Sequence, residues 1–221
     1  MNAVELKKVN KQIRGNSILV DIDLTLESNM IHGFSGRNAS GKTMLFRAIS
    51  GLITADSGMI RVFDEVIGSD VSFPSSMGLI IENIGLWNNL TGFENLKLLA
   101  GICNKIQDTD ILEAIARVGL DPYDKRRYGS YSLGMKQKLA IAQAIMEKPR
   151  LLILDEPTNG LDEESIDDFY KLLLEEKERG ATCLICSHQK DDIRLFSDYV
   201  YVMDVGRCYK EEGEKKNEKG N

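Results

Sequence analysis

The segment from residue 36 to residue 43 constrains this chain more than any other. It reads Gly-Arg-Asn-Ala-Ser-Gly-Lys-Thr and matches the pattern G-x-x-x-x-G-K-[ST] in full. The apolar residues 30–34 precede it and predict a strand, and the following residues predict a helix from Met44 to about residue 50. A chance glycine-rich turn is the alternative, but such a turn needs neither the strand nor the helix. The pattern therefore predicts a phosphate-binding loop.

The residue types in this loop suit a polyphosphate. Glycines let several backbone N–H groups point at one anion, and the N-terminus of the following helix adds a favourable potential. We expect Lys42 to reach the β- and γ-phosphates of a nucleotide and the hydroxyl of Thr43 to ligate Mg²⁺. The expected nucleotide contacts in this segment are Gly36, Arg37, Asn38, Ala39, Ser40, Gly41, Lys42, Thr43 and Met44.

Strands and helices alternate along most of the chain. Residues 18–26 alternate apolar and polar side chains, which predicts a hairpin or a meander at the edge of a sheet. Residues 90–148 favour helix, with helices expected at 107–118 and 135–148, whereas the four aliphatic residues 151–154 are typical of a buried parallel strand. We expect an α/β fold: a P-loop NTPase (RecA-like) core with a mostly parallel sheet, an antiparallel β edge subdomain and an inserted helical subdomain.

Length and composition limit the number of domains and the classes of partner that this chain can have. The chain has 221 residues, which predicts one domain over residues 1–210, with the helical subdomain at about 90–148, and a disordered polar tail over residues 211–221. The formal net charge of −6 gives no general attraction to nucleic acid. Since the chain has neither a signal-peptide pattern nor a run of about 18 apolar residues, we expect no membrane span.

Two carboxylates follow the strand predicted at residues 151–154. Asp155 lies where a carboxylate at the end of a strand can hold Mg²⁺ through water, and Glu156 can act as general base on an attacking water. His188 follows the next predicted strand, at 182–186, and emerges at the same sheet edge, where it can bond the γ-phosphate. The alternatives are a solvated acidic turn and an ordinary surface histidine. His32, inside the first strand, is expected to be structural.

Cys183 and Cys186 have a spacing known from metal and redox sites. They lie, however, in the strand predicted at residues 182–186, where side chains three positions apart point to opposite faces. We therefore expect small buried hydrophobic side chains rather than a metal or redox pair.

Three further segments carry a resemblance to a known family. Residues 131–139 read Tyr-Ser-Leu-Gly-Met-Lys-Gln-Lys-Leu and resemble the signature motif of ABC-type ATPases. Residues 155–162 resemble the Walker B end and D-loop of that family, and residues 187–188 resemble its switch histidine. With the phosphate loop, the four motifs stand in the family's order, and the resemblance covers nearly the whole chain.

The resemblance implies a mechanism that two copies share. Ser132 and Gly134, at a helix N-terminus, would clamp the γ-phosphate of ATP bound to the opposite subunit. The expected cofactors are ATP and Mg²⁺, and the expected partners are a second ATPase subunit, identical or homologous, and a multi-spanning membrane permease. The chain would then be cytoplasmic, held on the inner face of the cell membrane by that permease, with no nucleic-acid partner.

Several residues depart from the family's pattern. Leu133 and Met135 replace a glycine and a glutamine of the signature, and Ile13 stands near the position of the usual adenine-stacking aromatic. Glu82 replaces the glutamine of the Q-loop and is expected to reach Mg²⁺ or its water; a solvated loop residue is the alternative. Trp87 is either a residue that docks on the permease or a packed core tryptophan.

These departures resemble the ATPases of small bacterial exporters, such as bacitracin-resistance and lantibiotic-immunity systems. The expected function is therefore ATP hydrolysis that drives a separate permease, an exporter of an antimicrobial peptide, a drug or a related compound. Two alternatives remain open here: a non-transport ABC ATPase acting on nucleic acid or ribosomes, and a regulatory nucleotide-binding module without catalysis. The transported substrate is not encoded in this chain, because specificity lies in the permease.

Overall fold

The computed structural model describes residues 1–81, 85–187 and 190–211. The predictions made for Glu82, for His188 and for most of the polar tail therefore lie outside the described residues. Among the described helices, none is both long and apolar enough to cross a membrane.

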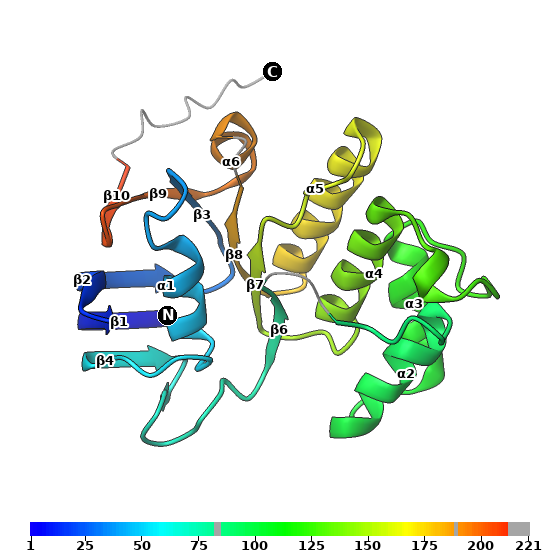
Figure 1. Cartoon of the computed structure of the whole chain (residues 1–221), viewed down its shortest axis with the longest axis horizontal. Coiled ribbons are helices and arrows are strands. Elements are labelled where there is room, and N and C mark those ends of the chain that lie inside the picture. The colour runs from blue at the N-terminus through cyan, green and yellow to red at the C-terminus, as the bar shows by residue number, and fades with distance from the viewer. Residues whose placement is uncertain (82–84, 188–189, 212–221) are drawn as a thin grey trace.

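The first sheet is antiparallel and has the strand order β2-β1-β4-β5. Its strands are β1 (Asn2–Ile13), β2 (Asn16–Glu27), β4 (Ser57–Val62) and β5 (Glu65–Val66). The period-two pattern predicted for the first hairpin appears in β2, where Ile22, Leu24 and Leu26 are buried and the residues between them are exposed. The antiparallel β edge subdomain that the sequence predicts is thus present (Figure 1).

The second sheet is mostly parallel and has the strand order β10-β9-β3-β8-β7-β6. It contains β3 (Ile31–Gly36), β6 (Met77–Ile80), β7 (Leu151–Asp155), β8 (Thr182–Cys186), β9 (Tyr199–Asp204) and β10 (Arg207–Lys210). Only β10 runs antiparallel to its neighbour. Because β3, β8 and β7 are adjacent and parallel, their carboxyl ends meet at one edge of the sheet.

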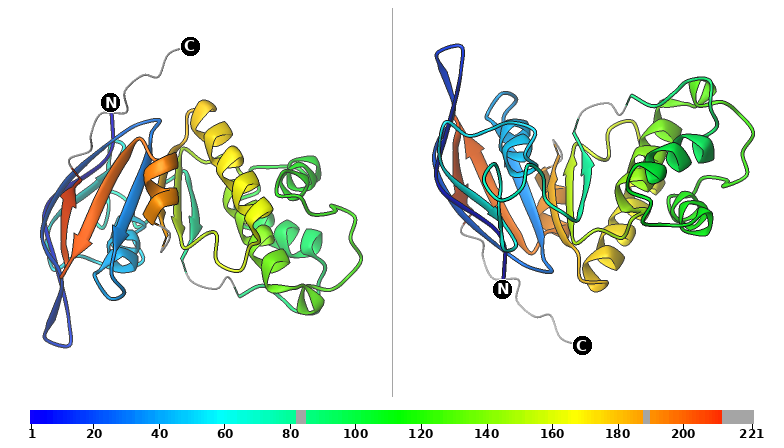
Figure 2. Two further views of the ribbon diagram at one scale, coloured as in Figure 1. Left: turned by 90° about the horizontal axis from the view of Figure 1, so that it is seen from above. Right: turned by 90° about the horizontal axis from the view of Figure 1, so that it is seen from below.

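Helices cover this sheet and extend beyond it. The helices α1 (Lys42–Ile49), α5 (Glu163–Glu178) and α6 (Lys190–Phe196) belong to the core, while α2 (Gly92–Cys103), α3 (Asp108–Arg117), the 3₁₀ turn η1 (Tyr128–Ser130) and α4 (Leu133–Ile145) form the helical part. The three views show this part on one side of the molecule and the antiparallel sheet on the other, with the parallel sheet between them (Figures 1 and 2).

Two helices begin earlier than the sequence predicts. α1 begins at Lys42 rather than Met44, so Lys42 and Thr43 belong to its first turn. α4 begins at Leu133 rather than residue 135, because the side chain of Ser132 caps it by accepting a hydrogen bond from the Met135 N–H. The first turn of α4 therefore contains part of the signature segment.

The core divides into two clusters on the two faces of the parallel sheet. One lies toward α4 and α5 and contains Cys183, and the other lies toward α1 and contains Cys186. The two thiols are buried on opposite faces, as predicted, and both are free. The spacing of Cys183 and Cys186 therefore reflects packing in β8 and not a shared metal or redox site.

Candidate nucleotide-binding site

The predicted phosphate loop connects β3 to α1, and its backbone carbonyl groups bind the side-chain amine of Lys42. Lys42 Nζ donates hydrogen bonds to the carbonyl O of Gly36 at 2.8 Å and of Arg37 at 3.2 Å. Gly36 (φ +155°) and Gly41 (φ +110°) adopt backbone conformations that favour glycine. A Cβ on Gly36 would lie 2.4 Å from the Met203 carbonyl O of neighbouring β9. The loop can hold this shape only with glycine at its ends.

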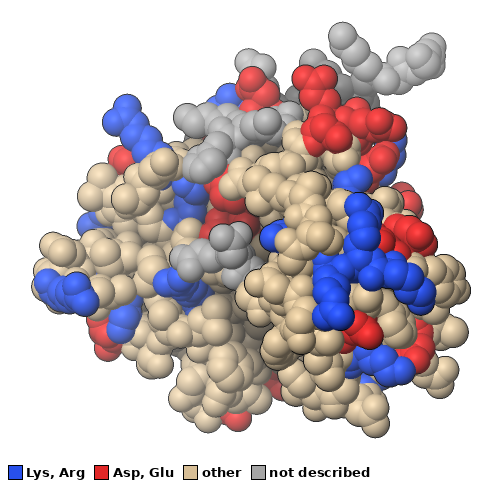
Figure 3. All heavy atoms as spheres, turned by 45° about the vertical axis from the view of Figure 1, so that its right-hand side comes forward, with Lys and Arg blue, Asp and Glu red and all other residues tan. Residues whose placement is uncertain are grey.

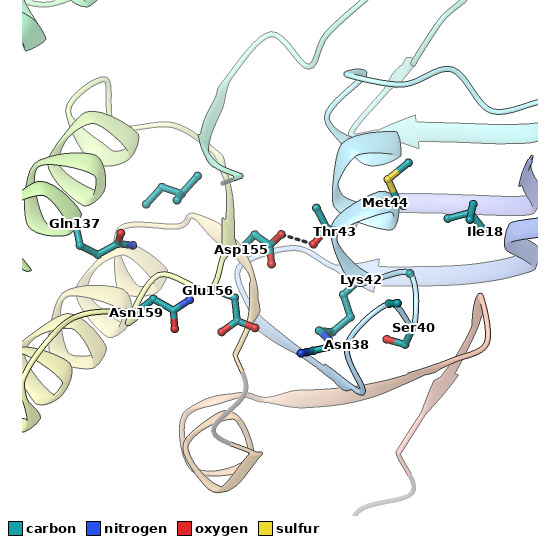
Figure 4. A pocket seen from close by; sticks show the side chains of 13 residues that line it. Ile18, Asn38, Ser40, Lys42, Thr43, Met44, Gln137, Asp155, Glu156 and Asn159 are labelled. Carbon is teal, nitrogen blue, oxygen red and sulfur yellow. Dashed lines mark hydrogen bonds between the residues drawn. The ribbon is translucent and has the colours of Figure 1, made fainter. Parts of the chain in front are cut away.

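The loop and the strand β7 meet through a direct contact. Thr43 Oγ1 donates a hydrogen bond to Asp155 Oδ2 at 2.6 Å, which Figure 4 shows as a dashed line. Asp155 is 8% exposed and ends β7, so its carboxylate is held at the sheet edge that the sequence predicts for it. A hydroxyl and a carboxylate at this distance form a pair of hard oxygen ligands.

Cys186 also contacts this carboxylate, which sequence reasoning missed. It pairs with Asp155 in the register of β7 and β8, and its Sγ donates a hydrogen bond to Asp155 Oδ1 at 2.5 Å. Burial, and then the negative charge of Asp155, raise the pKa of the Cys186 thiol well above its ordinary value. The thiol therefore stays protonated and orients the carboxylate. The sequence carries no signal for this contact, because it depends on the register of β8 beside β7.

Glu156 lies in an unusual backbone conformation. Its φ is +50°, which is uncommon for a residue with a side chain, and its N–H donates to the Cys186 carbonyl O at 3.0 Å. Ligand atoms of Asp155, Glu156 and Cys186 all lie within 4.8 Å of one another. Backbone strain of this kind persists where the surrounding structure imposes it, and it clusters at functional sites.

Asp155 and Glu156 line one cavity of about 640 Å³ together with the phosphate loop (Figure 4). Of the nucleotide contacts predicted in the loop, those that line it are Asn38, Ala39, Ser40, Gly41, Lys42, Thr43 and Met44. Gly36 and Arg37 contribute through the carbonyl groups that hold Lys42. Ile18, Ile80, Gln137 and Asn159 also line the cavity and were not predicted.

Ser132 and Gly134 of the signature do not line this cavity. Ser132 and Gly134 line a second hollow of about 300 Å³, together with Arg126 and Lys138. Lys and Arg side chains gather on the helical part of the surface (Figure 3). The fold thus brings the phosphate loop and the carboxylates together but leaves Ser132 and Gly134 at a separate place. Their predicted role toward a second chain remains a prediction.

Comparison with known proteins identifies the family. Residues 19–159 match the family model described as ABC transporter. The chain is 47% identical to the uncharacterized ABC transporter ATP-binding protein YybJ of Bacillus subtilis (strain 168), over 92% of this chain and 94% of that protein. It is 36% identical to the bacitracin transport ATP-binding protein BcrA of Enterococcus faecalis, over 94% of this chain and 68% of that protein.

Solved structures agree with this fold. The dimeric structure of a post-hydrolysis state of the ATP-binding cassette MJ0796, bound to ADP and Pi, superposes with a TM-score of 0.84 at 20% identity, covering 96% of this chain and 100% of that one. The α/β fold of the P-loop NTPase type, predicted from the phosphate loop, is confirmed. The chain belongs to the ATP-binding subunits of ABC transporters, a family of ATPases.

Proposed function

We propose that the cavity between the phosphate loop and the carboxylates binds ATP with Mg²⁺, and that this chain hydrolyses the bound ATP to drive a separate membrane permease. The observation that carries the proposal is the hydrogen bond between Thr43 and Asp155. It places a metal-ligand pair of oxygens beside the loop that holds Lys42. Phosphoryl transfer needs little more from a protein than positioning and charge stabilisation.

Each residue of the cavity then has a defined task. Lys42 exchanges its two backbone acceptors for phosphate oxygens and neutralises their charge. The Oγ of Ser40 is buried and has no hydrogen-bond partner among the described residues, so a phosphate oxygen suits it as an acceptor. Glu156, whose strained backbone aims its side chain into the cavity, accepts a proton from the attacking water.

The oxygen ligands fit Mg²⁺ better than a softer ion. Thr43 and Asp155 offer a hydroxyl and a carboxylate, which are the ligands that Mg²⁺ takes in nucleotide sites. The ion, when bound, neutralises charge on the β- and γ-phosphates. Asp155 stays fixed for this task because Cys186 holds its second oxygen. We assign a metal-linked role to Glu82 and a phosphate contact to His188 by family resemblance alone, since both lie outside the described residues.

A complete site requires a second chain. Ser132 and Gly134 line the second hollow, whereas Lys42 and Glu156 line the first cavity. One chain therefore does not bring these four residues into a single pocket. Ser132 stands at the N-terminus of α4, where free backbone N–H groups favour an anion. We propose that these two residues bind the γ-phosphate held by the partner subunit, so that ATP joins the pair and hydrolysis releases it.

Exposed apolar side chains on α2 and on the segment that precedes it suit a membrane partner. Trp87 is 49% exposed, and Leu98 and Ile102 of α2 are also exposed. Asn95 accepts from the Trp87 N–H at 2.8 Å and donates to the Trp87 carbonyl O at 3.1 Å, which fixes the backbone that carries the ring. We propose that this surface contacts the cytoplasmic face of a multi-spanning permease and holds the chain at the inner face of the membrane.

The proposed cargo is supported by the names of two relatives, and the proposed direction by the resemblance of the sequence to exporter ATPases. These two relatives are named for bacitracin transport and lantibiotic transport, the latter being SrtF of Streptococcus pyogenes at 31% identity. We propose export of an antimicrobial peptide or a related compound. The net charge of −6 does not favour the alternative of a nucleic-acid or ribosome partner.

The test uses a chain that binds ATP without consuming it. Tagged Glu156→Gln is mixed with detergent-solubilised native membranes, with and without ATP, and co-purified proteins are identified by mass spectrometry. We expect a multi-spanning protein in the ATP sample. A matched chain that also carries Lys42→Ala should recover it poorly. Recovery of ribosomes or nucleic acid in its place would refute the transporter assignment.

A further inference from the structure

A hairpin turn from near the end of the chain lies against the phosphate loop. The strands β9 and β10 are joined by only two residues, Val205 and Gly206, because Asp204 pairs directly with Arg207. Their φ angles are +44° and +76°, as a two-residue turn of type I′ requires. Val205 is 79% exposed, whereas Gly206 is buried. The glycine of the turn is therefore the residue that faces the rest of the molecule.

Gly206 binds the backbone of the loop directly. Its N–H donates a hydrogen bond to the Ser40 carbonyl O at 3.0 Å. That carbonyl belongs to the peptide between Ser40 and Gly41, and both of these residues line the cavity. In a planar trans peptide the C=O and the N–H point in opposite directions. The bond from Gly206 therefore turns the Gly41 N–H away from the hairpin turn.

The peptide between Ser40 and Gly41 needs such a bond to keep its orientation. The residues on either side of Ser40 have positive φ, which is +62° at Ala39 and +110° at Gly41. Glycine adopts many backbone conformations, so this peptide can rotate unless another group holds it. A rotated peptide would present a carbonyl oxygen where an N–H had been. Because anions bind to backbone N–H groups and are repelled by carbonyl oxygens, rotation would weaken a phosphate site.

The hairpin turn is itself held on its other side. The Gly206 carbonyl O accepts a hydrogen bond from the Val20 N–H of β2 at 2.8 Å. A Cβ on Gly206 would lie 2.7 Å from the Ile18 carbonyl O, and a Cβ on Gly41 would lie 3.6 Å from the Gly206 Cα. The turn is thus packed between β2 and the phosphate loop. It cannot accept a larger residue at position 206 without moving away from one of them.

We propose that Gly206 is a positioning residue for nucleotide binding: it holds the peptide between Ser40 and Gly41 so that the Gly41 N–H is presented to a phosphate oxygen. The proposal rests on the proposed function, since it concerns the phosphate end of the same cavity. Gly206 acts on the loop and not on a base. ATP and inorganic tripolyphosphate therefore depend on it to the same extent.

Calorimetric titration with ATP and with inorganic tripolyphosphate, each with Mg²⁺, tests the proposal in a Glu156→Gln chain that also carries Gly206→Ala. The added methyl group displaces the turn and breaks its bond to Ser40. Both dissociation constants should rise together by about tenfold, which is the worth of one hydrogen bond to a charged group. Equal affinities in the chains with and without Gly206→Ala would overturn the proposal. If the chain without it bound neither ligand, the proposed function itself would be wrong.

Gly15→Ala is the matched control. Gly15 is the second residue of the two-residue turn between β1 and β2, has φ +81°, and a Cβ there meets nothing within 4 Å. The substitution carries the same backbone strain as Gly206→Ala but lies far from any contact with the loop. It should leave both dissociation constants unchanged. A loss of affinity as large as that of Gly206→Ala would show that strain in a hairpin turn, and not the bond to Ser40, is the cause.

Amide hydrogen exchange measured by NMR gives a second test that does not require the Gly206→Ala chain to fold. In the Glu156→Gln chain, tripolyphosphate with Mg²⁺ should slow the exchange of the Gly206 N–H, because the anion orders the loop that accepts its hydrogen bond. Exchange of the Gly15 N–H should not change. An unchanged exchange rate at Gly206 on saturation with the anion would show that the turn and the loop are not coupled, and would overturn the proposal.

Discussion

Glu176 holds the helical part of the molecule against the core, and removing its charge should weaken the fold. Its carboxylate is 1% exposed. It accepts hydrogen bonds from Arg117 Nη1 of α3 at 2.6 Å and from Arg179 Nη2 and Nε at 2.6 and 2.9 Å. In Glu176→Gln the negative charge is lost. One carboxylate oxygen is replaced by an NH₂ group, which then faces a guanidinium, and neither of these two groups can accept a hydrogen bond.

The magnitude follows from the partners that remain. Breaking a buried ion pair costs about 3–5 kcal/mol when a charge is left unpaired. Here Arg117 still donates a hydrogen bond to Glu175, and Arg179 still donates to the carbonyl groups of Lys148 and Pro149. Neither guanidinium is therefore left without a hydrogen-bond partner. Both also reach solvent. We therefore expect a loss of about 2–4 kcal/mol in the free energy of unfolding, or about 4–16 °C in Tm for a chain of this size.

Urea unfolding followed by far-UV circular dichroism measures this loss. Glu175→Gln is the matched control, because Glu175 is the neighbouring acid of α5, is 62% exposed and makes a single bond to Arg117. It should cost less than about 1 kcal/mol, as exposed ion pairs do. If Glu176→Gln cost no more than Glu175→Gln, the argument that the buried carboxylate anchors α3 to α5 would be refuted.

Three further outcomes follow from the site and the core. Lys42→Ala should raise the dissociation constant of ATP by about tenfold or more, since it removes a charge-assisted contact, and calorimetry checks this. Thr43→Val keeps the side-chain shape but loses the bond to Asp155, so the Mg²⁺ concentration that gives half-maximal ATPase activity should rise; an unchanged value would exclude Thr43 as a ligand. Burial lowers the pKa of His32, which is fully buried, below that of the unfolded chain. The unfolded state therefore binds the proton first, and stability is lost as pH falls below about 6.5, by up to about 1.4 kcal/mol per pH unit. His32→Phe, which keeps the ring stacked on Tyr199, should flatten this part of a stability profile measured by urea unfolding.

The sequence predicts best those elements in which the local residue pattern agrees with what the tertiary structure requires of the backbone and of burial. The chain turns from β3 into α1 within residues 36–41 because only glycine fits the conformations at positions 36 and 41. Residues 151–154 are a strand because both faces of the parallel sheet are covered, which is why all four are aliphatic and buried. The loop requires glycine conformations and the strand requires burial on both faces. Because one requirement dominates in each segment, the residue types alone identify the segment.

The parts that the sequence could not predict depend on register between distant segments. Cys186 contacts Asp155 only because β8 pairs with β7 at that level, and nothing within residues 182–186 specifies the pairing. Gln137 reaches the cavity because α4 packs beside the loop that follows β7. The positive φ of Glu156 is likewise imposed by its surroundings and is not a preference of glutamate.

The first turn of α4 is tied to the loop that follows Glu156, and this bears on how two sites would act together. Gln137 Nε2 donates to the Pro157 carbonyl O at 2.8 Å. A Cβ on Gly160 would lie 2.7 Å from atoms of the Leu133 side chain, so these two residues are in direct contact and position 160 requires glycine. In the proposed pair, α4 serves the partner's nucleotide while Glu156 serves the chain's own. A shift of α4 on binding the partner's γ-phosphate would therefore move the loop beside Glu156 or break these contacts. Leu133, which stands where the signature carries a glycine, is 65% exposed and contributes to this link only through its atoms beside Gly160.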